Sequence, residues 1–271
     1  PRARCLDIIK DKGKQKQFYS DNGIKTSSFF IVQKHEEWLG AAQKLGKSVF
    51  VAKSCTDGYD GKGVSIINIE DLINQGSNFK FPFSGETLIE EFIENQKEIS
   101  VIVACDSFGN MANYPVVEMV FDPEANLVDF LASPARISPE MFLDHDGNVW
   151  VNEIAPRPHN SGHHTIEANY TSQYEQLNRI LLGLPLGSCE AIESAAMVNL
   201  LGASDFSGTY YLEGLEEALS MEGVYIHLYG KKESKPKRKM GHFTVLGKSI
   251  EEVEQKAYKI KEILKFKPDG K

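Results

Sequence analysis

A glycine-rich segment between two strand-like runs is the feature that most restricts the fold of this chain. Residues 57–63 (DGYDGKG) place three glycines in seven residues. Residues 48–53 before it and 63–69 after it are rich in β-branched and aromatic side chains, which favours strands. Such glycines let backbone N–H groups approach a polyphosphate closely, although an isolated loop of this kind is also typical of a plain hairpin turn. Neither a Walker loop nor a GxGxxG motif is present, so we exclude those two nucleotide-binding folds.

Charged side chains at the ends of strand-like runs indicate a nucleotide site. Lys53 ends an apolar run, where a lysine is costly unless its ammonium group meets an anion such as a phosphate or lies at the surface. Glu98 directly precedes another apolar run and suits the ribose hydroxyls of a nucleotide. Glu94, in contrast, is typical of a solvated edge strand.

Residues 152–167 (NEIAPRPHNSGHHTIE) carry the most chemistry in the chain. The segment begins with Asn152 and Glu153, whose oxygen atoms suit Mg²⁺ bound to the phosphates of ATP. Arg157 offers a planar fork to a carboxylate or a phosphate. The residues that follow can donate hydrogen bonds to a small polar substrate: His159, Asn160 and Ser161. Zinc is the weaker alternative for the histidines of this segment, because neither cysteine ligands nor an HExxH spacing accompany them.

Composition excludes several classes of function. The formal net charge of −8 argues against nucleic-acid or anionic-membrane binding as the main role, because either needs a basic surface. No apolar run approaches the roughly 20 residues that span a bilayer, and residues 1–16 have no signal-peptide pattern, so we expect a cytoplasmic protein. The basic run at residues 231–239 (KKESKPKRK) fits either a solvated loop or a phosphate-binding patch. Free, buried thiols are expected rather than a zinc site at the four scattered cysteines: Cys5, Cys55, Cys105 and Cys189.

The alternation of helix-like and strand-like segments favours an α+β protein. Four strands of an antiparallel sheet are expected in the middle of the chain, at residues 87–92, 97–106, 111–120 and 127–132. A tight hairpin is expected from residues 141–144 and 148–154. A smaller α+β unit with a final helix at residues 249–264 should follow the breaker cluster at residues 183–187 (GLPLG).

Four motifs, in this order, resemble the N5-carboxyaminoimidazole ribonucleotide synthetases of the ATP-grasp superfamily: residues 57–63, 152–168, 183–187 and 238–242 (RKMGH). The resemblance implies an ATP-grasp fold of two α+β lobes with a small C-terminal α+β or β domain, divided as residues 1–92, 93–187 and 188–271. It implies an ATP-dependent ligase that carboxylates 5-aminoimidazole ribonucleotide with bicarbonate, through carboxyphosphate, in purine biosynthesis. It also implies Mg²⁺ or Mn²⁺ as the metal, a homodimer, and handover of the product to the N5-carboxyaminoimidazole ribonucleotide mutase.

The same resemblance assigns roles to individual residues. For ATP it implies Lys53, Gly58, Tyr59, Gly61, Gly63, Val64, Glu90, Glu91, Phe92, Ile93, Glu98 and Asn152. For the ribonucleotide and its carboxylate it implies Tyr59, Asp60, Lys62, Arg157, His159, Asn160, Ser161, Lys231 and Arg238. Of these, the residues expected to act in catalysis are Asp60, Lys62, Arg157, His159 and Asn160. The metal ligands implied are Glu140 and Glu153.

The chain departs from the family pattern in three places. The family has an N-terminal nucleotide-fold-like domain of roughly a hundred residues, which has no counterpart in this chain. A family helix is absent beside Glu140, which suggests omitted residues. Residues 118–121 (EMVF) stand where the family carries Glu-Asn and a later histidine near the nucleotide. Two alternatives remain, namely another ATP-grasp ligase with a different acceptor and a catalytically inactive nucleotide-binding module.

Overall fold

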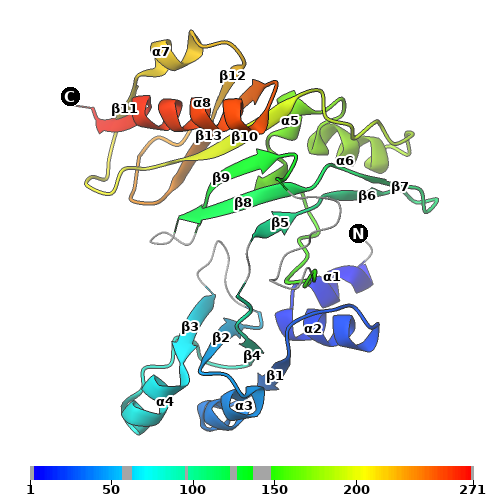
Figure 1. Cartoon of the computed structure of the whole chain (residues 1–271), viewed down its shortest axis with the longest axis vertical. Helices are drawn as coiled ribbons and strands as arrows, with labels where there is room; N and C mark the ends of the chain where they lie inside the picture. The colour runs from blue at the N-terminus through cyan, green and yellow to red at the C-terminus, as the bar shows by residue number, and fades with distance from the viewer. Residues whose placement is uncertain (1–2, 57–62, 95–96, 123–126, 137–147, 270–271) are drawn as a thin grey trace. The chain divides into compact units, whose positions relative to one another are not determined.

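The computed structural model describes residues 3–56, 63–94, 97–122, 127–136 and 148–269 (Figure 1). Six residues that carry predicted roles therefore lie outside the described part: Gly58, Tyr59, Asp60, Gly61, Lys62 and Glu140. The chain forms two compact units. The first unit comprises Pro1–Gln96 and Ser138–Arg157, and the second comprises Lys97–Ile137 and Pro158–Lys271. The three-part division after residues 92 and 187 stays a prediction.

The first unit is built on a four-stranded antiparallel sheet with the order β1-β4-β2-β3 (Figure 1). Its elements are α1 (Ala3–Ile9), α2 (Lys12–Asp21), β1 (Phe29–Val32), η1 (His35–Glu37), α3 (Trp38–Leu45), β2 (Val49–Ser54), β3 (Val64–Asn68), α4 (Ile69–Gln75), η2 (Gly76–Asn78) and β4 (Thr87–Glu91). The core lies where Trp38 of α3 packs against Phe50 and Ile89 of the sheet. The predicted pattern of strand, glycine loop and strand is confirmed by β2 and β3.

The prediction of a strand at residues 148–154 is wrong. Its partner in the expected hairpin, residues 141–147, lies outside the described residues, and residues 148–154 form no strand. The segment is held instead by residues 25 and 26, because Val151 N donates to Lys25 O at 2.9 Å and Thr26 Oγ1 donates to Val151 O at 2.7 Å. The Lys25 ammonium lies 4.3 Å from the centroid of the Trp150 ring. These contacts satisfy the backbone N–H and C=O groups of Val151 without a partner strand.

The second unit contains a six-stranded antiparallel sheet with the order β12-β13-β10-β9-β8-β5 (Figure 1). Its elements are β5 (Glu98–Ser100), β6 (Val103–Cys105), β7 (Met111–Asn113), β8 (Val117–Asp122), β9 (Leu127–Ser133), η3 (Asn160–Gly162), α5 (Thr165–Ala168), α6 (Gln173–Leu181), β10 (Ser194–Leu201), β11 (Tyr210–Glu213), α7 (Leu215–Leu219), β12 (Val224–Leu228), β13 (Lys239–Gly247), α8 (Ile250–Ile263) and β14 (Lys265–Pro268). Helix α8 packs on β10 and β13, and its Val253 and Ile260 share a core with Phe243 and Val245.

Two features of this sheet differ from the expectation. The strands expected at residues 97–106 and 111–120 are each divided in two, with β6 and β7 forming a separate ribbon. The middle strands and the C-terminal strands also belong to one sheet, because β9 pairs with β10. Sequence patterns show which segments are extended, but this pairing joins segments about sixty residues apart and depends on packing.

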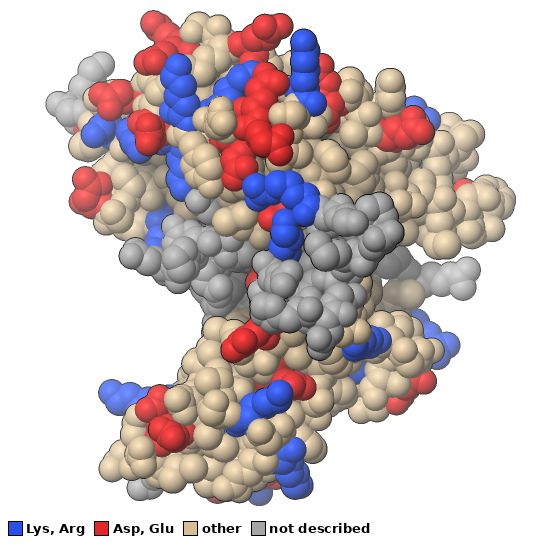
Figure 2. Space-filling view, viewed as in Figure 1, with Lys and Arg blue, Asp and Glu red and all other residues tan. Residues whose placement is uncertain are grey.

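The distribution of charged side chains on the surface agrees with the acidic composition. On the face in Figure 2, acidic and basic side chains are interspersed and form no broad basic field. Within the described ranges, no helix is both long enough and apolar enough to cross a membrane. The cysteines are free as expected, but the expectation of burial is wrong for Cys5 and Cys105, which are exposed. These two lie on α1 and on the two-stranded ribbon, where little packs over them.

Candidate active site

A buried ionic cluster lies at the end of β2 in the first unit. Lys53 is 8% exposed and Glu90, on the neighbouring strand β4, is 3% exposed. The Lys53 ammonium forms an ion pair with Glu90 Oε1 and donates to Asn152 Oδ1 at 2.7 Å. Lys53 is therefore a buried lysine at the predicted place, and the alternative of a surface lysine is excluded.

The second cation of this cluster, Lys16 of α2, was missed by the sequence analysis. Lys16 is 2% exposed, and its ammonium lies 2.8 Å from Glu90 Oε2, 2.6 Å from Thr26 Oγ1 and 2.7 Å from Ser27 Oγ. Burial lowers the pKa of Lys16, and the Glu90 carboxylate opposes this shift. The buried face of α2 includes Gln15, Lys16 and Tyr19, so it has no apolar stripe that could have identified it.

The cluster holds one carboxylate between two ammonium groups, which leaves a net positive charge in a buried place. Burial acts to raise the pKa of Glu90, but Lys53 and Lys16 outweigh it and lower this pKa. Glu90 Oε1 forms an ion pair with Lys53, and Oε2 forms an ion pair with Lys16 and accepts a hydrogen bond from the Ser27 hydroxyl. The Glu90 side chain therefore holds the two lysines in place. An excess positive charge of this kind favours the binding of an anion such as a phosphate. A small cavity of about 10 Å³ beside it is lined by Lys12, Gln15, Lys16, Lys53, Leu88, Asn152 and Glu153.

Asn152 and Glu153 are fixed by their neighbours in the chain and lie outside the sheet. Val151 is bonded to residues 25 and 26, and Ile154 N donates to Gln15 Oε1 at 3.0 Å. The Glu153 carboxylate is exposed next to Asn152, whose Oδ1 faces the Lys53 ammonium. Exposed carboxylate and amide oxygens beside buried cations are a donor set that fits Mg²⁺ bound to a polyphosphate. Glu140, the second predicted ligand, lies outside the described residues.

The glycine loop starts and ends beside Lys53. Ser54 N donates to Gly63 O at 3.0 Å, and Val64 pairs directly with Lys53 in the sheet. On the other side, β4 ends at Glu91, and Phe92 and Ile93, which are predicted to bind ATP, follow after the end of this strand. The Glu91 carboxylate is 3.1 Å from the Lys47 ammonium. The roles predicted for these residues in ATP binding stay predictions.

In the second unit, the predicted substrate residues are ordered around His159. Its Nδ1 accepts from Ser161 N at 3.3 Å. Since a backbone N–H can only donate, the neutral ring carries its proton on Nε2. The Ser161 hydroxyl is buried between His159 Nδ1, at 3.0 Å, and Ser100 Oγ, at 2.8 Å. The Asn160 side-chain Nδ2 is buried without a hydrogen-bond partner among the described residues, which is consistent with a donor awaiting a ligand.

The remaining predicted residues occupy different places. Arg157 is exposed in the first unit, and Glu98 is exposed on β5 in the second. Lys231 and Arg238 lie on the loop between β12 and β13, where Lys231 Nζ donates to Lys239 O and Arg238 Nη1 donates to Glu233 O at 3.0 Å.

Glu118, in the stretch that departs from the family pattern, is committed to an ion-pair network. Its carboxylate lies 3.1 Å from the Lys97 ammonium and pairs through both oxygens with the Arg136 guanidinium, each at 3.1 Å. Burial acts to raise the pKa of Glu118, but Arg136 and Lys97 outweigh it and lower this pKa. The carboxylate thus stays ionised and serves to hold Lys97 and Arg136.

The main chain of His159 is held by one buried side chain, Gln173 of α6. His159 N donates to Gln173 Oε1 and Gln173 Nε2 donates to His159 O, both at 2.9 Å. Replacing Gln173 with leucine removes both bonds, and we expect a loss of about 2 kcal/mol in the free energy of unfolding. Urea denaturation followed by circular dichroism measures this loss, with Gln17→Leu, an exposed position, as the control. Equal midpoints for the two variants would contradict the assigned clamp.

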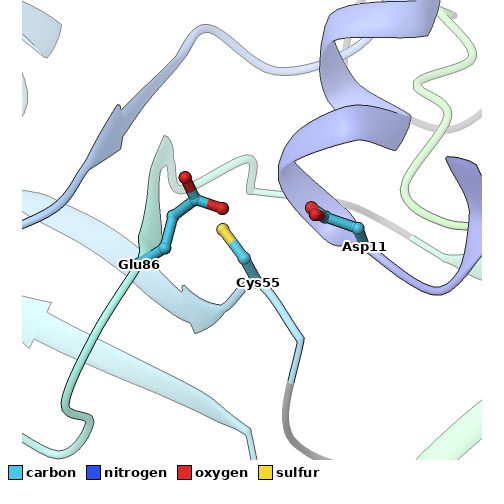
Figure 3. A group of neighbouring side chains, drawn as sticks. All are labelled: Asp11, Cys55 and Glu86. Carbon is cyan, nitrogen blue, oxygen red and sulfur yellow. The ribbon is translucent and has the colours of Figure 1, made fainter. Parts of the chain in front are cut away.

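A second group of potential metal ligands in the first unit consists of Asp11, Cys55 and Glu86, whose side chains point toward one another in Figure 3. Their ligand atoms lie within 4.8 Å of one another. Burial, followed by Glu86 and Asp11, raises the pKa of the Cys55 thiol to about 12, so the thiol stays protonated. Asp11 caps α2 by accepting from Lys14 N at 3.1 Å, and Glu86 accepts from Gln33. We therefore assign this group a structural role at the start of the glycine loop.

Comparison with known proteins identifies the family. A model of the ATP-grasp domain matches residues 17–139 and 124–174, and a model of the phosphoribosylaminoimidazole carboxylase C-terminal domain matches residues 195–256. The N5-carboxyaminoimidazole ribonucleotide synthase of Aquifex aeolicus is 35% identical, over 98% of this chain and 75% of the relative. This chain belongs to the N5-carboxyaminoimidazole ribonucleotide synthase family.

Solved structures of family members agree with this membership. The synthetase from Thermotoga maritima is 41% identical with a TM-score of 0.84, covering 98% of this chain and 74% of that one. The synthase from Aspergillus clavatus, solved with ADP and 5-aminoimidazole ribonucleotide, is 25% identical with a TM-score of 0.80, covering 96% and 74%. The predicted α+β ATP-grasp fold with a C-terminal domain is confirmed.

Proposed function

We propose that this chain is an ATP-dependent ligase that carboxylates 5-aminoimidazole ribonucleotide to N5-carboxyaminoimidazole ribonucleotide in purine biosynthesis. The observation that carries the proposal is its similarity, over nearly the whole chain, to synthases of this name, one of which was solved with ADP and 5-aminoimidazole ribonucleotide. The buried cluster of Lys16, Glu90 and Lys53 supports it, because a nucleotide phosphate neutralises the excess positive charge.

The carboxyl donor in this proposal is bicarbonate. A bicarbonate oxygen attacks the γ-phosphorus of ATP, the bond to ADP breaks, and carboxyphosphate forms. The amine of the ribonucleotide then attacks the carboxyl carbon, phosphate leaves, and the amine loses a proton. Because carboxyphosphate reacts with water, the site must exclude solvent during these steps.

In this proposal the predicted site residues, together with Lys16, divide this work between them. Lys53 and Lys16 stabilise the phosphate charge, and Glu153, with Glu140, would hold Mg²⁺ or Mn²⁺. The bound metal ion would neutralise charge on the transferring phosphoryl group. On the substrate side, His159 donates a hydrogen bond from Nε2 to the ribonucleotide, and Asn160 donates one from its amide. Arg157 binds the carboxylate. Lys231 and Arg238 bind the phosphate of the ribonucleotide, with Asp60 and Lys62 completing the catalytic set.

The proposal extends to the partners of the protein. We assign a homodimer, handover of the product to the N5-carboxyaminoimidazole ribonucleotide mutase, and a cytoplasmic location. The homodimer and the handover rest on the family resemblance, and the location keeps the expectation drawn from the sequence. Analytical ultracentrifugation tests the dimer, since a monomer at micromolar concentration would contradict it.

Phosphate release tests the function and the metal role together. We expect release from ATP with bicarbonate to increase strongly when 5-aminoimidazole ribonucleotide is added. In Glu153→Gln we expect the stimulated rate to fall at least about 100-fold, because a ligand oxygen with full negative charge is lost. The matched control is Glu94→Gln, which changes an exposed carboxylate near the end of β4. Phosphate release without stimulation by the ribonucleotide would leave an ATP-grasp ligase with a different acceptor.

A further inference from the structure

A row of polar side chains crosses one face of the large sheet in the second unit. His242 of β13 pairs directly with Asn199 of β10 on one side and with His227 of β12 on the other. The next residue on β13, Phe243, belongs to the apolar core under α8. Because successive side chains of a strand alternate between faces, His242 lies on the face opposite to α8. Helix α5 packs on β13 and is one of the elements that cover this face of the sheet.

Three histidine rings form a continuous stack on this face. His163, just before α5, stacks on His242 with ring centroids 4.7 Å apart and an interplanar angle of 27°. His242 stacks on His227 at 4.6 Å and 13°. His227 Nε2 lies 2.7 Å from Glu167 Oε1 of α5, which closes the far end of the stack. The stack therefore connects α5 to β13 and β12.

The stack contacts both segments that carry the predicted ribonucleotide ligands. His163 N donates to Asn160 O at 3.1 Å, which joins the stack to the segment 159–161. At the other end, the Tyr229 hydroxyl is 2.9 Å from His242 Nδ1, and the Lys231 ammonium lies 5.8 Å from the centroid of the Tyr229 ring. An unbroken series of contacts thus runs from Asn160 through His163, His242 and Tyr229 to Lys231.

Two of the three rings, His163 and His242, remain neutral near physiological pH. Burial lowers the pKa of His163 to about 4 and that of His242 to about 3, with smaller contributions from neighbouring cationic groups. Neutral rings stack without the repulsion that two imidazolium ions would experience. The titratable groups around them come from five elements: His159 from the start of η3, Glu167 and His164 from α5 and its start, Tyr174 from α6, His227 and Tyr229 from β12 and its end, and Lys239 from β13.

A metal site is the main alternative for a group of histidines. Stacked rings that are nearly parallel direct their nitrogen atoms along separate planes and do not converge on one ion. In the part of the chain that the structure describes, the only group of such ligands close enough for a metal is the one at Asp11, Cys55 and Glu86. The stack therefore functions through packing and hydrogen bonds.

We propose that the stack of His163, His242 and His227, together with Tyr229, is a positioning element of the ribonucleotide site. It holds the segment 159–161 and the loop carrying Lys231 in one fixed arrangement, so that the predicted ligands of the substrate are set before it binds. The inference deepens the proposed function and rests on it, because those ligands are the ones expected for 5-aminoimidazole ribonucleotide. Tyr229 acts through Lys231 and His242 and is a positioning residue, with no direct contact to substrate required.

The test compares two single-atom deletions. Tyr229→Phe removes the hydroxyl that bonds His242 and keeps the ring under Lys231. The matched control Tyr225→Phe removes a hydroxyl from an exposed tyrosine of β12, the strand that ends just before Tyr229. We expect Tyr229→Phe to raise the KM for 5-aminoimidazole ribonucleotide about fivefold, the size of one buried hydrogen bond, and to leave the KM for ATP unchanged. In a Lys231→Met background, we expect Tyr229→Phe to add nothing further, because the group that it positions is gone.

The possible results separate this inference from the function on which it rests. A wild-type protein whose phosphate release is not stimulated by the ribonucleotide overturns both. A stimulated wild type with the same ribonucleotide KM in Tyr229→Phe and Tyr225→Phe overturns the positioning role alone. An equal rise in the KM for ATP and for the ribonucleotide also overturns it, because that pattern indicates a general loss of structure.

Discussion

Replacing Glu90 with glutamine is expected to destabilise the first unit by about 3 to 5 kcal/mol. The carboxylate stands between two buried ammonium groups, and glutamine keeps its shape while removing the charge that compensates them. Breaking a buried ion pair on one side has this cost because the remaining charges stay desolvated. The deficit should shrink toward pH 10, since the pKa of Lys16 is already lowered by burial and a neutral Lys16 relieves the repulsion with Lys53.

Tryptophan fluorescence during urea unfolding measures this effect directly. Both tryptophans of the chain, Trp38 and Trp150, lie in the first unit, and Trp38 is fully buried in its core. The matched control is Glu91→Gln, which changes the next residue and removes a more exposed pair with Lys47. We expect the control to lose less than about 1 kcal/mol. Equal losses in the two variants would show that the cluster does not hold the unit together.

Replacing His164 with leucine is expected to make the second unit less sensitive to acid. His164 is fully buried, and burial lowers its pKa to about 4, with the Ser161 backbone acting in the opposite direction. In the unfolded chain its pKa is about 6.5, so between pH 6.5 and pH 4 the unfolded state binds one more proton than the folded state. The wild type therefore loses about 1.4 kcal/mol per pH unit from this group as the pH falls through that window. Leucine has no such proton and no such loss.

Unfolding at two pH values distinguishes the variant from the wild type. At pH 7 the two should differ by less than about 1.5 kcal/mol, since leucine fills a similar volume. At pH 4.5 the variant should have gained about 2 to 3 kcal/mol relative to the wild type. Because the second unit contains no tryptophan, circular dichroism or amide exchange of β10 and β13 is the suitable measurement. Stability curves that run parallel from pH 7 to pH 4.5 would contradict a neutral, buried His164.

The buried ionic cluster of the first unit and the histidine stack of the second unit depend on the same physical principle. In the first unit, Lys16 and Lys53 depend on a single buried carboxylate, and in the second, His163 and His242 depend on staying neutral. In both places the low polarity of the interior makes the state of one group depend on its neighbours. Substitutions there should therefore change stability and ligand binding together, unlike substitutions of exposed charges such as Glu94.

The sequence by itself determined much of the fold and the kind of chemistry. Runs of β-branched residues on both sides of the glycine loop predicted β2 and β3, and the periodic final segment predicted α8. These features are local, because strand and helix propensities and turn residues act over a few positions. Lys53, one residue before the end of β2, lies in the expected strand, but its burial, one of two alternatives, was decided by packing. Family-specific motifs then indicated the reaction.

Only the tertiary structure decided which distant groups meet. Nothing in the polar sequence of α2 distinguishes Lys16 from its exposed neighbour Lys14, and only packing against β4 brings Lys16 to Glu90. The histidine stack likewise depends on the register between β12 and β13, which sets His227 opposite His242. A shift of one residue would turn these side chains to the other face of the sheet. Such contacts join segments far apart in the chain, so their energy has no counterpart in local sequence patterns.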